Sequence, residues 1–177
     1  LFLSISISIY LSLSISIYIY RYNSSNSISS IGYLRKYLVI LNPVSGPGQS
    51  LSLFEDIVRP MFEEAAIEVE LLITKHANHA TEYVQNEHTD LSQFDAIVTM
   101  GGDGIIYEVI NGIVNRGGKG QGLKLLQMLP LAILPGGTGN GLAKSALYAS
   151  NDENYSVLNA GKCLVLTIAI AITITNK

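Results

Sequence analysis

The chain has 177 residues, of which 48% are hydrophobic, so it can bury one sizeable core and is expected to form a single folded domain. Its formal net charge is −3, from 11 basic and 14 acidic residues without a basic stripe, and no nucleic-acid partner is expected. A single cysteine, Cys163, cannot form an internal disulfide, which excludes a disulfide-stapled secreted fold and favours a cytoplasmic location. We expect Cys163 to be a small buried residue.

Both ends of the chain are of low complexity. In residues 1–20, Leu or Ile at the odd positions alternates with Ser, Tyr or Phe, a period that is typical of neither a membrane helix nor a signal peptide. A linker rich in Ser and Asn follows, and the last residues, "TIAIAITITNK", return to the same pattern. We expect a low-complexity segment with linker at 1–32, a folded domain at 33–161 and a low-complexity tail at 162–177. Because the chain begins with Leu, we expect a fragment or an imperfect gene model.

Between these ends, short apolar runs alternate with segments of helical periodicity. The runs at 37–42, 67–74, 94–100 and 131–135 predict buried strands. Apolar residues three and four positions apart predict helices near 51–62, 79–88, 105–114 and 139–149, and the third of these is apolar around much of its girth. This alternation predicts an α/β fold with a parallel sheet covered by helices on both faces. In such sheets ligands bind beyond the carboxyl ends of the strands.

The turns after the predicted strands carry the most unusual composition. Three of them, "NPVSGPGQS", "GGDGIIYE" and "PGGTGNG", are rich in glycine, and the remaining one is "TKHANHA". Glycine leaves no Cβ between the backbone and a ligand, so successive N–H groups can converge on a phosphate at a helix start. The alternative is that these glycines only form tight turns. Neither the P-loop nor the dinucleotide-binding motif fits, because "GPGQSLSL" has no lysine and Glu108 stands where the second motif needs compact packing.

Asp103 lies between glycines in the turn after the third predicted strand. A carboxylate repels phosphate oxygens, which argues against a purely phosphate-binding role. Phosphoryl transfer to a hydroxyl needs a group that accepts the hydroxyl proton, and Asp103 suits that task. The alternative is that it caps the helix that begins near Ile105. His76 and His79 are spaced as metal ligands often are, but without a third ligand we expect no metal site and assign them to the surface or to a nucleotide.

These motifs resemble those of the lipid kinases related to diacylglycerol kinase. "LVILNPVSGPGQS", "LLITKHANHA", "VTMGGDGIIYEVINGI" and "LPGGTGNGLAKS" occur in the order and at about the spacing of that family. Within it, the form "GTGNGLAKS", with Gly141 after the Asn, and the "NHA" of the second motif are more similar to the sphingosine kinases than to the diacylglycerol kinases. The resemblance identifies residues 33–161 as a catalytic, nucleotide-binding domain with a fold like that of phosphofructokinase and NAD kinase.

The resemblance also implies a reaction and its residues. The γ-phosphoryl group of ATP, with Mg²⁺, would pass to the hydroxyl of a lipid at a peripheral membrane surface. Because the motifs are most similar to those of sphingosine kinases, the implied lipid is a sphingoid base. Asp103 would be the catalytic base, and the turn formed by Gly101, Gly102, Asp103 and Gly104 would approach the substrate. The nucleotide would contact Asn42, Pro43, Val44, Thr74, Lys75, His76, Ala77, Asn78, Gly101, Glu108, Gly137, Thr138 and Gly139.

One departure from the family concerns length. Its members continue into a second, mostly β domain that holds much of the lipid, and we expect that domain to be absent from this chain. Alternatives therefore remain open. The chain is expected to act on a sphingoid base, but a diacylglycerol kinase, an NAD kinase and a catalytically silent fragment are also consistent with the motifs.

Overall fold

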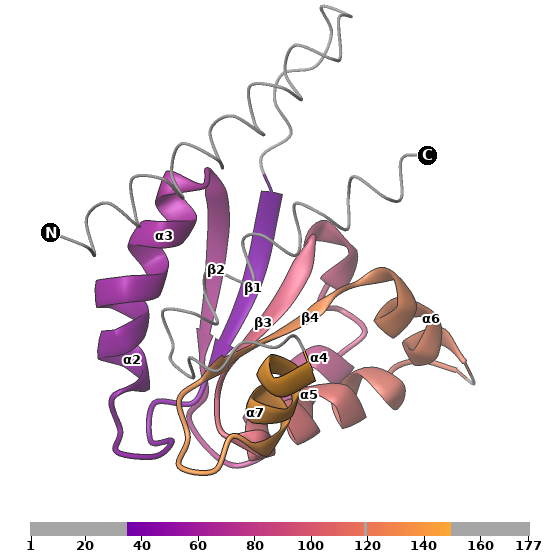
Figure 1. Ribbon diagram of the computed structural model, residues 1–177. Helices are drawn as coiled ribbons and strands as arrows, with labels where there is room; N and C mark the ends of the chain where they lie inside the picture. Colours follow the sequence, from indigo (N-terminus) through magenta and orange to yellow (C-terminus); the bar gives the residue numbers. More distant parts are fainter. Residues whose placement is uncertain (1–34, 119, 150–177) are drawn as a thin grey trace, which may run out of the picture. The chain divides into compact units, whose positions relative to one another are not determined.

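A computed structural model describes residues 35–118 and 120–149 (Figure 1). The predictions for residues 1–32, for Cys163 and for residues 162–177 lie outside the described part. The strands are β1 (Arg35–Leu41), β2 (Ile67–Ile73), β3 (Ala96–Gly101) and β4 (Leu131–Pro135). The helical elements are α2 (Ser50–Leu53), η1 (Phe54–Val58), α3 (Arg59–Glu64), α4 (His79–Gln85), η2 (Leu91–Gln93), α5 (Asp103–Val114), α6 (Gln121–Met128) and α7 (Gly141–Ala149).

The strands form one parallel sheet in the order β2-β1-β3-β4, which confirms the predicted α/β fold. β1 is central, since Val39 pairs with Leu71 of β2 on one side and with Val98 of β3 on the other. The chain thus adds a strand on one side of β1 and then continues on the other side. The strand order reverses between β1 and β3, and in open α/β sheets such a switch point is where ligands bind.

Helices cover both faces of the sheet, with α2 and α3 on one face and α4 and α5 on the other (Figure 1). Successive strand residues point to opposite faces. In β1, Tyr37, Val39 and Leu41 pack in the core cluster beneath α2 and α3, whereas Leu38 and Ile40 pack beneath α4 and α5. All five are fully buried. A strand buried on both faces is apolar at every position, which is why its sequence predicted a buried parallel strand.

The first predicted helix spans Ser50 to Glu64 but is not regular throughout. Its middle part, η1, is a π-helix, and Pro60 follows at the start of α3. Proline has no N–H to donate, so the ordinary pattern of helical hydrogen bonds cannot continue through it. Phe54, Val58 and Phe62 still lie four residues apart and are fully buried, so the helix keeps one continuous face against the sheet.

The structure differs from the prediction in three elements. α6 was not predicted, because the glycine-rich stretch before it hides its start. α4 ends at Gln85 rather than near His88. α5 buries Ile105, Ile106, Val109 and Ile113 as predicted, but Val114, which the apolar pattern places among its buried residues, is 40% exposed. Among the described residues, no helix is long and apolar enough to cross a membrane.

Candidate active site

Asp103 is exposed at the carboxyl edge of the sheet, where β3 passes into α5. Its carboxylate accepts two backbone N–H groups from the first turn of α7: Gly141 N donates to Oδ2 at 2.9 Å and Leu142 N donates to Oδ1 at 3.1 Å. Hydrogen bonds to a carboxylate favour its charged form. The bond from Gly141, then that from Leu142, and more weakly the charge of Lys144 hold the pKa of Asp103 below its ordinary value. Asp103 is therefore an ionised carboxylate in a fixed orientation.

The alternative role of Asp103 as the cap of its own helix is wrong. α5 begins at Asp103 itself, its N-cap is Gly102, and no side chain caps its N-terminal amides. Asp103 instead caps α7, whose first residue lies 38 positions further along the chain. A carboxylate at a helix N-terminus is favoured by both the free N–H groups and the helix dipole. Each carboxylate oxygen also keeps a lone pair that can accept a hydroxyl proton.

The turn after β1 is fastened to β3 by its first residue, Asn42. The backbone N–H of Asn42 donates to Met100 O at 2.9 Å, and its side-chain Oδ1 accepts the N–H of Val44 at 3.1 Å. This bond closes a local turn of the kind that Asn side chains favour. The side chain of Val44 is 82% exposed as a consequence. The predicted nucleotide residues of this turn thus lie directly at the switch point.

The turn after β4 is closed by Asn140, which is 5% exposed and has a φ of +52°. Its Oδ1 accepts the N–H of Gly137 at 2.9 Å, and its Nδ2 donates to Gly137 O at 2.5 Å. The turn is joined to the third motif by Gly136 N, which donates to Gly101 O at 2.9 Å. The backbone N–H of Gly137 is therefore already used within the turn. Those of Thr138 and Gly139 donate to no group in the described part of the chain.

The glycines of these turns serve two different purposes. A Cβ on Gly46 would lie 2.8 Å from Gly136 O, and one on Gly137 would lie 2.5 Å from the Cα of Gly102, closer than real Cβ atoms come. Packing of main chain against main chain thus accounts for these glycines, as the tight-turn alternative requires. Gly104 differs, because a Cβ there would meet nothing within 4 Å. Gly104 borders open space beside Asp103.

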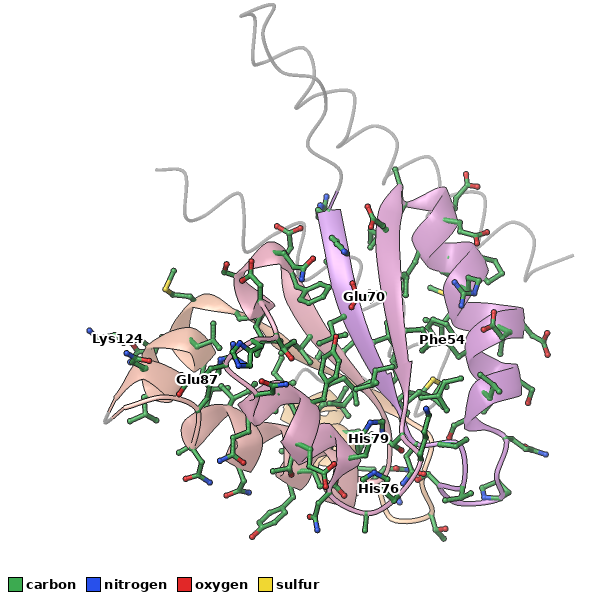
Figure 2. All side chains as sticks on the ribbon, turned by 180° about the vertical axis from the view of Figure 1, so that it is seen from behind. Phe54, Glu70, His76, His79, Glu87 and Lys124 are labelled. Carbon is green, nitrogen blue, oxygen red and sulfur yellow. The ribbon has the colours of Figure 1, made fainter. Side chains whose placement is uncertain are left out.

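The turn after β2 lies at the same edge of the sheet and carries the two neighbouring histidines (Figure 2). Lys75 N donates to His79 Nδ1 at 3.2 Å, and the rings of His76 and His79 are 4.8 Å apart. His76 Nε2 lies 3.7 Å from Glu82 Oε2. No group of three or more His, Cys, Asp or Glu side chains is placed to hold a metal ion within residues 35–118 and 120–149.

Glu108 is half-buried where α5 packs against α4. Its backbone O accepts the hydroxyl of Thr81 at 3.0 Å. Its carboxylate makes no hydrogen bond or ion pair with the described residues. This carboxylate is therefore available to hydroxyl groups of a ligand, but it lies outside the glycine-rich turns.

The structure brings most of the predicted residues together. Hydrogen bonds and glycine contacts join the turns after β1, β3 and β4, which contain Asn42, Pro43, Val44, Gly101, Gly102, Asp103, Gly104, Gly137, Thr138 and Gly139. The turn after β2, with Thr74, Lys75, His76, Ala77 and Asn78, is attached beside them through Thr74 N, which donates to Leu41 O at 2.8 Å. Glu108 stands apart on α5.

Sequence reasoning missed two kinds of group in the site. Asn140 supports the turn after β4. An Asn among glycines is a signal of positive φ, and Asn140 does adopt a positive φ. Ser50 is buried and places its hydroxyl 3.5 Å from Gly136 O. The backbone donors of Gly141 and Leu142 carry no signal in the sequence, because any residue other than proline has an N–H.

The chain is similar to a known protein family and to individual curated proteins. The family described as diacylglycerol kinase catalytic domain matches residues 36–170. The chain is 38% identical to "Sphingosine kinase 2" of Arabidopsis thaliana over 81% of the chain and 30% of that protein. It is 42% identical to "Sphingosine kinase 1" of Rattus norvegicus over 67% of the chain and 29% of that protein.

A solved structure, that of a diacylglycerol kinase from Bacillus anthracis, is similar as well. It matches with a TM-score of 0.55 and 30% identity over 77% of this chain and 43% of that chain. The chain therefore spans less than a third of the length of the two curated relatives and less than half of this structure.

Proposed function

Because this chain belongs to the diacylglycerol kinase catalytic domain family, we propose that it is the nucleotide-binding part of an ATP-dependent lipid kinase that phosphorylates a sphingoid base. The observation that carries the proposal is the ionised, oriented carboxylate of Asp103 at the switch point of the sheet. The names of the similar curated proteins support the choice of a sphingoid base over diacylglycerol.

Asp103 acts as the base of the transfer. The lipid hydroxyl donates a hydrogen bond to the free lone pair of the carboxylate, which accepts the proton as the hydroxyl oxygen bonds to the γ-phosphorus and the bond from that phosphorus to the leaving ADP oxygen breaks. The depressed pKa of Asp103 keeps the group ionised near neutral pH. It also makes Asp103 a weak base, so its main contribution is to align the hydroxyl.

The nucleotide occupies the adjoining turns. The N-terminal amides of α5 have no side-chain cap, and Gly104 leaves open space beside them, so they suit phosphate oxygens. The amides of Thr138 and Gly139, which donate to none of the described residues, would add further donors. We assign the remaining contacts to Asn42, Pro43, Val44, Thr74, Lys75, His76, Ala77, Asn78, Gly101, Glu108 and Gly137, with Glu108 accepting hydroxyl groups rather than facing phosphates.

Mg²⁺ fits this site only together with the nucleotide. The described residues supply no preformed cluster of ligands, and Mg²⁺ commonly keeps several waters and binds through one or two carboxylates and substrate phosphates. The phosphate oxygens would hold it together with Asp103, the carboxylate of the glycine-rich turns. It would supply positive charge that offsets the charge on the phosphoryl group.

Because the proposed acceptor is a lipid, we expect the carboxyl edge of the sheet to face a membrane surface. Val44, Tyr107 and Leu142 are 82%, 70% and 47% exposed. Leu142 donates its N–H to Asp103, Tyr107 lies one helical turn after Asp103 on α5, and Val44 lies in the turn after β1. Exposed apolar side chains on the segments that form a reaction site suit a lipid better than a polar acceptor. A cytoplasmic enzyme that binds membranes reversibly is consistent with this arrangement.

The proposal is tested by incubating the full-length gene product with labelled ATP, Mg²⁺ and three acceptors, namely sphingosine and diacylglycerol in mixed micelles and NAD in solution. We expect the label to appear in phosphorylated sphingosine. In parallel, calorimetry with the 177-residue chain measures ATP binding without any acceptor. Label in diacylglycerol or NAD alone would overturn the sphingoid base. ATP binding without transfer to any acceptor would overturn the proposed kinase activity. If neither ATP binding nor transfer is detected, the chain is catalytically silent.

A further inference from the structure

His79, the first residue of α4, closes the turn that follows β2 with both its backbone and its side chain. Its backbone N–H donates to His76 O at 3.3 Å, and its ring Nδ1 accepts the backbone N–H of Lys75 at 3.2 Å. Asn78, within this turn, has a φ of +65°, which Asn tolerates better than most residues. A side chain on a helix thus holds the backbone of a turn that we assign to the nucleotide.

The helix that carries His79 is itself held in place. The hydroxyl of Thr81, half a turn further along α4, donates to Glu108 O on α5 at 3.0 Å. At its other end the turn is attached to β1, because Thr74 N donates to Leu41 O at 2.8 Å. His79 therefore joins the middle of the turn to the helical layer, while Thr74 joins its beginning to the sheet.

The hydrogen bonds define which nitrogens of the two neighbouring imidazole rings carry protons (Figure 2). Because Nδ1 of His79 accepts a hydrogen bond, it has no proton, and the ring is neutral with its proton on Nε2. Nδ1 of His76 lies 3.0 Å from Ala77 O, which can only accept, so His76 carries a proton on Nδ1. The ring of His79 thus serves the turn as an acceptor, and that of His76 serves it as a donor.

We infer that His79 is a positioning residue for the nucleotide: Nδ1 of its neutral ring fixes the backbone of residues 74–78 in the conformation that receives ATP. This inference rests on the proposed function, because it takes that turn as part of the ATP site. His79 is half-buried, whereas Lys75, His76 and Asn78 are exposed. A ligand therefore meets the exposed residues, and His79 acts through them. A turn that is already ordered loses less conformational freedom when the nucleotide binds.

Two amide side chains distinguish the two nitrogens of the His79 ring. Oδ1 of an Asn is separated from Cα by the same number of bonds as Nδ1 of a His, whereas the amide group of a Gln reaches the position of Nε2. His79→Asn therefore keeps an acceptor for the N–H of Lys75. His79→Gln keeps a polar side chain but moves the acceptor away, and His79→Ala removes it.

The kinetic test compares these three variants in the full-length gene product. We expect the KM for ATP to rise about fivefold in His79→Ala and His79→Gln but less than about twofold in His79→Asn, since the loss is that of one neutral hydrogen bond. We expect kcat to stay within about threefold in all three, because the carboxylate of Asp103 is held independently by α7. Equal KM values for the Asn and Gln variants would overturn the inference.

His88 provides the matched control for these substitutions. It is an exposed histidine beyond the end of α4, outside the candidate site. His88→Ala should leave both kcat and the KM for ATP unchanged. A rise in KM equal to that of His79→Ala would show that the loss of any histidine near α4 has this effect, and would also overturn the inference.

A second test needs no enzymatic activity. In the 177-residue chain, we expect NMR to find the proton of the His79 ring on Nε2 at neutral pH and the amide proton of Lys75 protected from exchange. The protection should persist in His79→Asn and disappear in His79→Gln. Protection in a chain that does not bind ATP would refute the proposed function and, with it, the role of His79 in binding. An unprotected Lys75 amide in a chain that binds ATP would overturn the inference and leave the proposed function standing.

Discussion

At the scale of single residues, Asp103 caps α7 and is also the group that we propose aligns the substrate hydroxyl. Asp103→Asn keeps the size of the side chain and one acceptor oxygen but removes the charge. We expect kcat of the full-length gene product to fall about 100-fold or more, with ATP affinity within a few-fold, because a positioned base contributes about 10² to 10⁴. Steady-state kinetics and calorimetry measure the two effects.

Asp90 provides the matched control for this substitution. It too is an exposed aspartate whose pKa is lowered by hydrogen bonds, in its case from Ser92, but it precedes η2 and lies outside the candidate site. Asp90→Asn should leave turnover unchanged. If Asp103→Asn also retained full turnover, Asp103 would be a structural cap only.

Asn140 carries a prediction about stability. Its side chain makes two hydrogen bonds to Gly137 while its backbone has a positive φ. Asn140→Gly loses the hydrogen bonds but tolerates the backbone, whereas Asn140→Ala loses both advantages. We expect Asn140→Ala to lower the free energy of unfolding by about 1 kcal/mol more than Asn140→Gly does, since a left-handed conformation costs a residue with a Cβ about 1–2 kcal/mol. Denaturant unfolding measures the difference, and equal stability of the two variants would show that the backbone there is unstrained.

At the scale of elements, the contact between α4 and α5 depends on Gly112. A Cβ on Gly112 would lie 2.9 Å from Thr81 O and closer still to the side chain of Val84. We expect Gly112→Ala to destabilise the chain by about 1–3 kcal/mol through overpacking. Gly104→Ala makes the same change in the same helix at a position with nothing within 4 Å, and it should not destabilise the chain. Thermal melts of the two variants test this contrast, which fails if both melt at the same temperature.

A second link between these helices comes from Arg116, just after α5. Its guanidinium donates to Val84 O at 2.8 Å and Asn86 O at 2.6 Å at the end of α4, and to Glu87 O and Thr89 O in the loop beyond. Carbonyl groups at a helix C-terminus lack partners within the helix, and a cation there is favourable. Arg116 thus holds the end of α4 and the loop that follows it against the end of α5.

Replacing Arg116 should therefore loosen α4 from its far end. We expect Arg116→Gln to lower the free energy of unfolding by about 2 kcal/mol, because hydrogen bonds to a charged group contribute about 1.5–3 kcal/mol. Amide exchange at residues 84–89 should accelerate at the same time. Lys124→Gln removes a positive charge from an exposed position on α6 and should change the stability by less than about 0.5 kcal/mol. Equal stability of the two variants would show that Arg116 contributes no more than a surface charge.

At the scale of the whole molecule, three carboxylates with lowered pKa values make the stability of the fold depend on pH. The pKa of Glu55 is lowered by Arg59, that of Asp90 by Ser92, and that of Asp103 by the amides of α7. A carboxylate with a lowered pKa in the folded state contributes stability above its unfolded pKa, and this contribution is lost as the pH falls through the folded value. We expect the melting temperature to be steady near neutral pH and to fall below about pH 4. Melts across this range test the expectation, and a flat profile would contradict it.

Much of the fold could be predicted from the sequence, because the pattern that defines each strand lies within the strand itself. Strands buried on both faces are uniformly apolar, and this made β1 and β3 recognisable. Where distant partners decide, the sequence was insufficient. Arg116 binds the carbonyl groups at the end of α4 from a distant part of the chain, and the carboxylate of Asp103 is held by amides 38 and 39 residues away. The glycine motifs indicated where the candidate site lies, but not that Gly46 and Gly137 let one stretch of main chain pack against another.

That contact of main chain with main chain has a consequence for the entropy of binding. Side chains can rotate aside within nanoseconds, but no rotation opens a contact between Gly46 and Gly136 or between Gly102 and Gly137. These contacts therefore restrict the independent movement of the turns after β1, β3 and β4. A ligand that meets them finds its partners already ordered, and little conformational freedom remains to be lost when it binds.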